Sequence, residues 1–180
     1  MKSLFKLKFL LLVFMVCTIS SVAWGQMEKP PKKLASPRDS VSKTIAGADI
    51  DINYGRPSVR KRKIWGGLVP YGQVWRTGAN EATRFTTSKD IVVEGKTLAA
   101  GTYGFFAIPT ETQWTIIFNS IPNQWGAFKY DSTKDVLRVM VTPKKAGKNN
   151  HLHYKINSKG FELVWAKLAV PVTVTSTVTR

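Results

Sequence analysis

Short stretches of alternating apolar and polar residues constrain the fold of this chain more than any other feature. From Ala48 onward the apolar residues recur with a period of two, which is the spacing of a β-strand with one buried face. Turn-forming residues separate these stretches, and no stretch has the 3.6-residue period of an amphipathic helix. The pattern predicts an all-β fold, either an antiparallel β-sandwich or a jelly-roll-like barrel.

The expected strands follow one another closely, and two of the links read as tight turns. An E-G-K turn joins two short strands, and an N-S-K-G turn makes a hairpin of the segments 151–157 and 161–167. The strand that contains W-T-I-I-F is expected to be buried on both faces. The expected strands are 48–54, 82–87, 91–93, 97–99, 102–108, 113–119, 136–142, 151–157, 161–167 and 170–178.

The first 25 residues have the composition of a secretory signal peptide. Three lysines precede an apolar run from Phe9 to Val16, and Ala23 and Gly25 are the small residues expected before a cleavage site. We therefore expect an exported protein, located in the periplasm, in the cell envelope or outside the cell. An uncleaved anchor and a lipid attached at Cys17 remain as alternatives.

Residues 26–40 are rich in proline and lysine and poor in apolar side chains, so they are expected to form a flexible tether. Residues 41–180 then form a single β domain, which is long enough to bury a core of its own. Because the single cysteine, Cys17, lies in the expected signal peptide, the mature chain has no disulfide and no thiolate site.

The chain is strongly basic. The formal net charge is +16, and removing the lysines at positions 2, 6 and 8 with the signal peptide leaves +13. Such a charge favours an anionic envelope surface as a partner, and the basic run Arg60–Lys63 is a candidate contact with anionic lipid, although such runs are commonly solvated loop tips. Export and the lack of a nucleic-acid-binding motif argue against nucleic acid. The oligomeric state stays open.

The segment from Tyr54 to Thr83 is an exceptionally long connection between two expected strands. It holds five glycines, two prolines, two tryptophans and six Lys/Arg residues, but one acid, Glu81. Loops of this length in a compact domain are generally functional or disordered, and the apolar residues here argue against disorder. We therefore expect one long ordered loop with a functional role.

Several strings in and after this loop resemble the DUF2911 family of exported bacterial proteins of unassigned function. They are Y-G-R-P-S-V-R-K-R-K-I-W-G-G-L-V-P-Y-G-Q-V-W-R-T-G-A-N-E-A-T, L-A-A-G-T-Y-G-F-F-A-I-P, W-T-I-I-F-N, N-Q-W-G-A-F-K-Y and V-L-R-V. The resemblance spans about Val41 to Trp165. It implies a β-rich domain of the cell envelope and supplies no established catalytic residues.

The loop carries side chains suited to binding a polar or acidic ligand. Arginine forks match carboxylate and phosphate oxygens, amides both donate and accept, and flat tryptophan rings suit sugars. A second loop, 122–130, has amides and aromatics of the same kind and is expected to face the first. The candidate ligand-binding residues are Arg56, Trp65, Trp75, Arg76, Asn80, Glu81 and Trp125.

Three functions remain open on this basis. The first is a protein of the cell envelope that binds a polar or acidic small molecule or glycan at the 54–83 loop. The second is a hydrolase or lyase acting on such a ligand, with Glu81 as the candidate acid or base and Arg76 stabilising charge. The third is a structural or interaction module, in which Arg76 and Glu81 form a salt bridge and the tryptophans fill the core. No cofactor and no metal site are expected.

Overall fold

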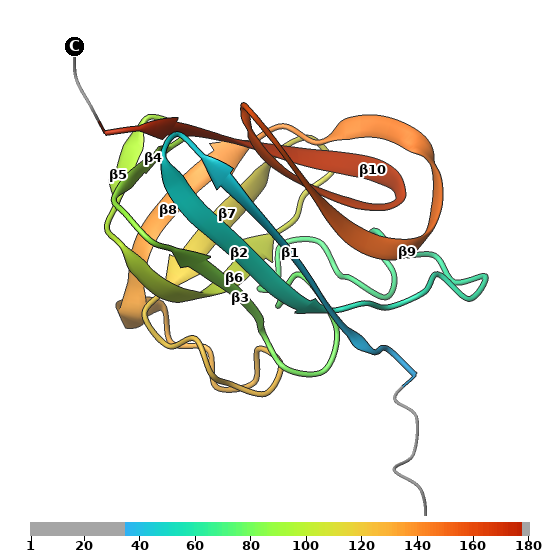
Figure 1. Cartoon of the computed structure of the whole chain (residues 1–180). Helices are drawn as coiled ribbons and strands as arrows, with labels where there is room; N and C mark the ends of the chain where they lie inside the picture. The colour runs from blue at the N-terminus through green and yellow to red at the C-terminus, as the bar shows by residue number, and fades with distance from the viewer. Residues whose placement is uncertain (1–34, 178–180) are drawn as a thin grey trace, which may run out of the picture. The chain divides into compact units, whose positions relative to one another are not determined.

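A computed structural model describes residues 35–177, which form two antiparallel sheets (Figure 1). The six-stranded sheet has the order β1-β2-β3-β6-β7-β8 and the four-stranded sheet has the order β5-β4-β10-β9. The strands are β1 Arg38–Ile45, β2 Ala48–Gly55, β3 Thr83–Thr87, β4 Ile91–Val93, β5 Lys96–Leu98, β6 Gly101–Ile108, β7 Trp114–Asn119, β8 Asp135–Val141, β9 Lys144–Asn157 and β10 Gly160–Ser176. One turn of 3-10 helix, Ser132–Lys134, precedes β8.

Each sheet has an edge strand on either side, so neither sheet closes on itself. The main hydrophobic core lies between the two sheets. Phe85 and Phe105 of the six-stranded sheet meet Phe161 of β10, with ring centroids 5.3 and 5.6 Å apart. The predicted all-β fold is therefore confirmed, in the form of a β-sandwich whose two sheets do not close into a barrel. The described residues contain no helix of the length and apolarity needed to cross a bilayer.

Two strands differ from the expectation. β9 and β10 are 14 and 17 residues long, so the segments expected as separate strands at 161–167 and 170–178 are one strand. The pairing shifts register on both sides of Ala166, whose φ is 54°. A bulge of this kind bends a strand without ending it, and the period of two is lost there.

The first strand, β1, was not expected. It begins at Arg38, inside the segment 26–40 whose composition predicts a tether, and it pairs with β2 along its whole length. Ala46 and Gly47 form the turn, both with positive φ, as a tight hairpin requires. The predicted signal peptide and the part of the predicted tether before residue 35 lie outside the described residues.

The long loop between β2 and β3 is packed against the sandwich, as predicted. Ile64, Val69, Trp75 and Thr77 are buried, whereas Leu68 remains 46% exposed. The loop is tied to β6 by two backbone hydrogen bonds between Trp75 and Ala107, of 2.8 and 2.9 Å. Its first half lies against β9 and its last residues lie beside the loop that follows β7 (Figure 1).

Candidate functional site

The last residues of the long loop are folded tightly onto the end of β2. The amide of Ala79 donates to the carbonyl of Gly55 over 3.2 Å. A Cβ atom at Gly55 would lie 1.9 Å from the Ala79 carbonyl oxygen, so a glycine is required at this contact. Thr77 and Asn80 both have positive φ, 52° and 64°, and these two residues turn the chain toward β3.

This turn places the loop beside the loop 120–131 that follows β7. The Gly126 amide donates to the Asn80 carbonyl over 3.0 Å, and the Ala82 amide donates to the Gln124 carbonyl over 2.9 Å. Glu81 and Trp125 face each other between these two bonds as an antiparallel bridge. The two loops that the sequence predicts as facing walls therefore lie side by side.

A hollow open to solvent lies where these loops meet β1 and β3, and we name it the Glu81 cleft. It has a volume of about 350 Å³. Its lining is mixed in character, with two guanidinium groups, one carboxylate, two amide side chains and one indole ring. The lining residues are Arg38, Glu81, Ala82, Arg84, Pro122, Asn123, Gln124 and Trp125.

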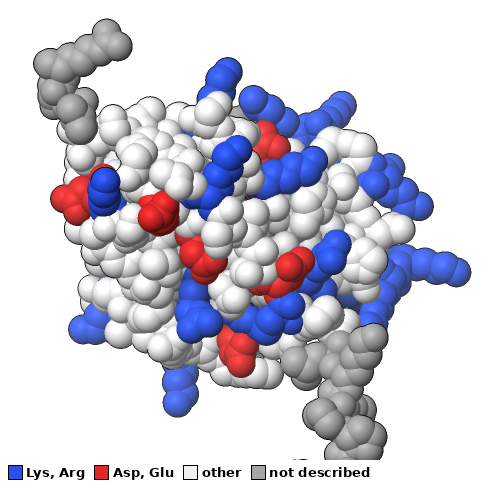
Figure 2. Space-filling view, in the orientation of Figure 1, with Lys and Arg blue, Asp and Glu red and all other residues white. Residues whose placement is uncertain are grey.

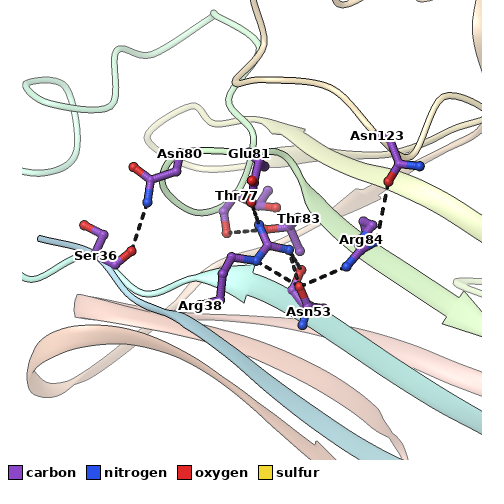
Figure 3. A network of polar contacts seen from close by, with 9 residues as sticks. All are labelled: Ser36, Arg38, Asn53, Thr77, Asn80, Glu81, Thr83, Arg84 and Asn123. Carbon is purple, nitrogen blue, oxygen red and sulfur yellow. Dashed lines mark hydrogen bonds and ion pairs between the residues drawn. The ribbon is translucent and has the colours of Figure 1, made fainter. Parts of the chain in front are cut away.

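A hydrogen-bonded network forms one wall of the cleft (Figure 3). Nη1 of Arg38 lies 2.9 Å from Oε2 of Glu81, and Nε of Arg38 donates to Oδ1 of Asn53 over 2.9 Å. Burial lowers the pKa of Arg38, and the Glu81 carboxylate opposes this shift. Arg38, which is partly buried, and Glu81, which is exposed, thus form an ion pair that contributes little net charge to the cleft.

Arg84 has a different environment from Arg38. Its side chain is exposed and reaches the amide oxygens of Asn53 and Asn123 over 3.5 Å each, the upper limit of a hydrogen bond. No carboxylate of the described residues forms an ion pair with it. Arg84 therefore supplies the positive charge in the cleft that is not already neutralised.

Trp125 is the exposed aromatic wall of the cleft, with 60% of its surface accessible. It also lines a neighbouring hollow of about 410 Å³, which we name the Phe128 hollow because Phe128 is 84% exposed there. That hollow is lined by Ile121, Asn123, Gln124, Trp125, Phe128 and Lys129. One indole ring thus contributes to both surfaces.

The structure brings some of the candidate residues together and separates others. Glu81 and Trp125 line the cleft. Asn80 lies next to it, where its side-chain amide donates to the Ser36 carbonyl over 2.9 Å (Figure 3). Arg56 does not line the cleft and lies 3.6 Å from a carboxylate oxygen of Asp39 instead.

Arg76 is half-buried and does not form the salt bridge with Glu81 considered above, because Glu81 pairs with Arg38. Burial lowers the pKa of Arg76, and its buried Nε has no hydrogen-bond partner among the described residues. An ideal Cβ at Gly126 would lie 3.7 Å from Nη1 of Arg76, which places the guanidinium close to the second loop.

Trp65 and Trp75 belong to the core rather than to the cleft. Together with Trp114 and Trp165 they form a cluster whose ring centroids lie 4.8 to 6.2 Å apart. Trp75 is 8% exposed, so its ring is not accessible to a ligand. Trp65 is less buried and lines a different hollow, which lies beside β9 and β10.

Arg38 and Arg84 were not among the candidates from the sequence. Arg38 lies in the segment whose composition predicts a tether, and pairing with β2 is what places it at the cleft. Arg84 lies between Thr83 and Phe85 of β3, which are both buried, so the alternation predicts that its side chain faces solvent. The sequence does not predict which residues surround that side chain. No group of three or more metal-ligating side chains occurs among the described residues.

A comparison with family profiles matches residues 36–174 to one family, described as "Protein of unknown function (DUF2911)". No curated protein and no solved structure gives a significant match. The matched residues include β1, β3, the long loop and the loop 120–131, which line the Glu81 cleft. The chain belongs to the DUF2911 family.

Proposed function

We propose that this protein binds an acidic sugar, or a similarly small polar anion, in the Glu81 cleft. One observation carries the proposal: an arginine without an acidic partner and a largely exposed tryptophan line the same hollow. A guanidinium fork pairs with a carboxylate, and a flat indole ring packs against a sugar ring. Arg84 and Trp125 are the residues that we assign to these two contacts.

The remaining groups of the cleft fit the same ligand. The side chain of Asn123 lines it with an amide donor and an amide acceptor, whereas Gln124 donates to the Ile121 carbonyl over 3.0 Å and so holds the loop. The ion pair between Arg38 and Glu81 fixes the position of the carboxylate, which is still 56% exposed and can accept a hydroxyl hydrogen bond. A volume of about 350 Å³ lies at the small end of ligand sites, so the cleft holds one or two rings of a ligand and a longer oligosaccharide extends beyond it into solvent.

Hydrolase or lyase activity is less well supported by this geometry. Glycoside hydrolysis generally uses two carboxyl groups that flank the bond to be broken. Among the described residues that line the cleft, Glu81 is the one carboxylate, and it is held by Arg38. Arg76, the predicted partner in catalysis, does not line the cleft. We therefore favour binding without chemical conversion.

Isothermal titration with oligosaccharides of matched length tests the proposal. We expect tetragalacturonate, which carries carboxylates, to bind the purified protein with saturation, and neutral cellotetraose to bind at least tenfold more weakly. Arg84→Gln and Trp125→Ala should each weaken tetragalacturonate binding by about tenfold or more, which corresponds to about 1.4 kcal/mol. Such a loss is in the range expected for one charged hydrogen bond or one aromatic contact.

Two exposed residues outside the cleft supply matched controls. Lys89→Ala removes one positive charge on the turn after β3, and Leu68→Ala removes one exposed apolar side chain of the long loop. Both variants should bind tetragalacturonate as the wild type does. Equal affinities in all five proteins, or no binding of tetragalacturonate, would reject the cleft as a site and favour a structural module.

The location of the protein is part of the same proposal. The basic start, the apolar run and the small residues of the first 25 positions support export to the cell envelope. There the protein would have access to acidic glycans. Cell fractionation and N-terminal sequencing test this directly. We expect a mature chain that begins at Gln26 in the envelope or secreted fraction, whereas an intact Met1 in the cytoplasmic fraction would contradict it.

A further inference from the structure

A second hollow lies at the other end of the long loop, and we name it the Trp65 hollow. Its volume is about 370 Å³. It forms where residues 59–65 approach β9 and β10, and the Val59 amide donates to the Asn150 carbonyl over 2.7 Å at this junction. The lining residues are Val59, Arg62, Lys63, Ile64, Trp65, Lys148, Asn150, Ala166 and Lys167.

The floor of the Trp65 hollow is apolar and rigidly held. The Trp65 ring packs against Trp114 and Trp165 of the core, with centroids 4.8 and 5.8 Å apart, while remaining partly accessible. Ile64 beside it is 4% exposed. A side chain fixed in this way offers a preformed apolar surface, so a ligand does not have to order it on binding.

The rim of the same hollow is positively charged. Four of its nine lining residues are Lys or Arg, and none of them is Asp or Glu. Arg62 donates to the Val59 and Ser58 carbonyls over 3.1 and 2.7 Å, which holds it in place. Lys63, Lys148 and Lys167 are exposed, and no ion pair joins them to a carboxylate of the described residues.

An apolar floor beside cations that form no ion pair within the described part of the chain favours one kind of ligand. The apolar part of a ligand gains free energy when its surface leaves water, and the cations attract a negative head at the edge of the hollow. A neutral sugar has no charge to pair with the cations of the rim. The volume is near the lower limit of ligand sites, which favours one short chain over a lipid with two acyl chains.

We infer that the Trp65 hollow binds a single-chain amphipathic anion, namely a fatty-acid carboxylate of medium chain length. Its alkyl chain lies on Trp65, and its carboxylate is held by the lysines of the rim. The Trp65 hollow and the Glu81 cleft share no lining residue. This site is therefore independent of the proposed glycan site, and either can fail without the other.

Titration with decanoate below its micelle-forming concentration tests this inference on the purified protein, with calorimetry and tryptophan fluorescence as readouts. We expect saturable binding of one decanoate per chain and a fluorescence change, because Trp65 lies in the floor. Decyl maltoside, which has the same chain and no charge, and acetate, which has the charge and no chain, should each bind at least tenfold more weakly.

Variants of the rim distinguish specific binding of decanoate in the Trp65 hollow from non-specific adsorption of a detergent-like molecule. The double variant Lys148→Ala/Lys167→Ala should weaken decanoate binding by tenfold or more. The double variant Lys89→Ala/Lys134→Ala removes the same charge at two exposed positions that do not line the hollow, and it should bind as the wild type does. Trp125→Ala should also leave decanoate binding unchanged.

Several outcomes would overturn the inference. They are non-saturable uptake, decyl maltoside binding as tightly as decanoate, and equal losses in the rim variant and its charge-matched control. If the rim variant is less stable, Asn150→Asp provides a second test, because it places a negative charge in the lining at an exposed position without removing a lysine. That variant should also lose decanoate binding, and retained affinity would reject the site.

Discussion

The Glu81 cleft and the Trp65 hollow are built by the two ends of one loop, yet their chemistry differs. In the cleft, one of the two arginines is paired with a carboxylate, amide side chains accompany them, and the aromatic ring is exposed to solvent. In the hollow, the charges have one sign and the aromatic ring is packed against the core. On the face seen in Figure 2, basic side chains outnumber acidic ones, and several Lys and Arg side chains extend into solvent away from any acid.

The difference teaches what each part of the loop contributes. Residues 59–65 lie against the long β9–β10 hairpin, and their apolar side chains complete the core. Residues 77–82 lie over the end of β2 and beside a second loop, so their polar groups meet other polar groups. The two ends of the loop therefore place their residues in different environments: apolar side chains pack against the core at one end, and polar side chains lie in an exposed network at the other.

The largest expected effect on stability distinguishes Trp65 from Trp125, which were both predicted from the sequence to bind a ligand. Trp65→Ala should lower the free energy of unfolding by about 3 kcal/mol, because it leaves a cavity beside Trp75, Trp114 and Trp165. Trp125→Ala should change it by about 0.5 kcal/mol or less, because that ring is mostly exposed. Urea unfolding of both variants measures this, and similar losses would contradict the distinction.

The next effect concerns the close contact that folds the cleft end of the loop. Gly55→Ala should lower the free energy of unfolding by about 1–3 kcal/mol, because the new Cβ meets the Ala79 carbonyl. Gly47→Ala meets no atom, but its φ of 78° adds strain of roughly 1 kcal/mol, so it serves as the control for backbone strain alone. A smaller loss of unfolding free energy for Gly55→Ala than for Gly47→Ala would contradict the close contact between residue 55 and the Ala79 carbonyl.

A smaller effect is expected at the ion pair of the cleft. Arg38→Met should cost about 1–2 kcal/mol, because the Asn53 side chain loses its donors as well. Glu81→Gln should cost less than about 1 kcal/mol, since the carboxylate is largely exposed and the pair is screened by solvent. Thermal unfolding of both variants at low and high salt tests the order, and a larger loss for Glu81→Gln would contradict it.

A separate effect is a loss of stability at high pH. Burial, and then the hydrogen bond to Asp135, raise the pKa of Tyr130 from 10.0 to about 12, and burial likewise raises the pKa of Tyr54 to about 12. Because the folded state favours the neutral phenols, their contribution is complete below pH 10 and is lost as the pH rises from 10 through about 12.

Tyr130 belongs to the loop that carries Trp125, so alkaline pH should loosen the cleft before it loosens the hollow. Denaturant unfolding between pH 8 and about pH 12 measures the decline, and Tyr130→Phe should flatten part of it. A variant with the same decline as the wild type would show that Tyr130 does not contribute.

Much of the fold was predictable, because a period of two survives wherever one face of a strand is buried. β2, β3 and β8 follow it, whereas β6 and β7 are buried on both faces and were recognised as apolar, aromatic runs. The predicted ranges agree with all five strands within two residues. β1 and the first half of β9 were missed for the same physical reason. Both are mostly exposed edge segments rich in polar residues, so no apolar alternation marks them.

The site was predictable in part. Glu81 and Trp125 were identified because a lone acid and an aromatic residue in loops are unusual, and the facing of their loops was inferred correctly. Arg38 was missed because its place depends on a strand pairing. Trp65 and Trp75 were candidates because a sequence does not tell which way a loop tryptophan turns, and here both turn inward.

The most direct test of this account is a nuclear magnetic resonance titration that follows the indole N–H signals of Trp65 and Trp125 in one sample. With tetragalacturonate, the Trp125 signal should move with saturation while the Trp65 signal stays in place, and with decanoate the reverse should hold. If tetragalacturonate leaves the Trp125 signal unmoved, or shifts both signals equally, the Glu81 cleft is not the glycan site that we propose.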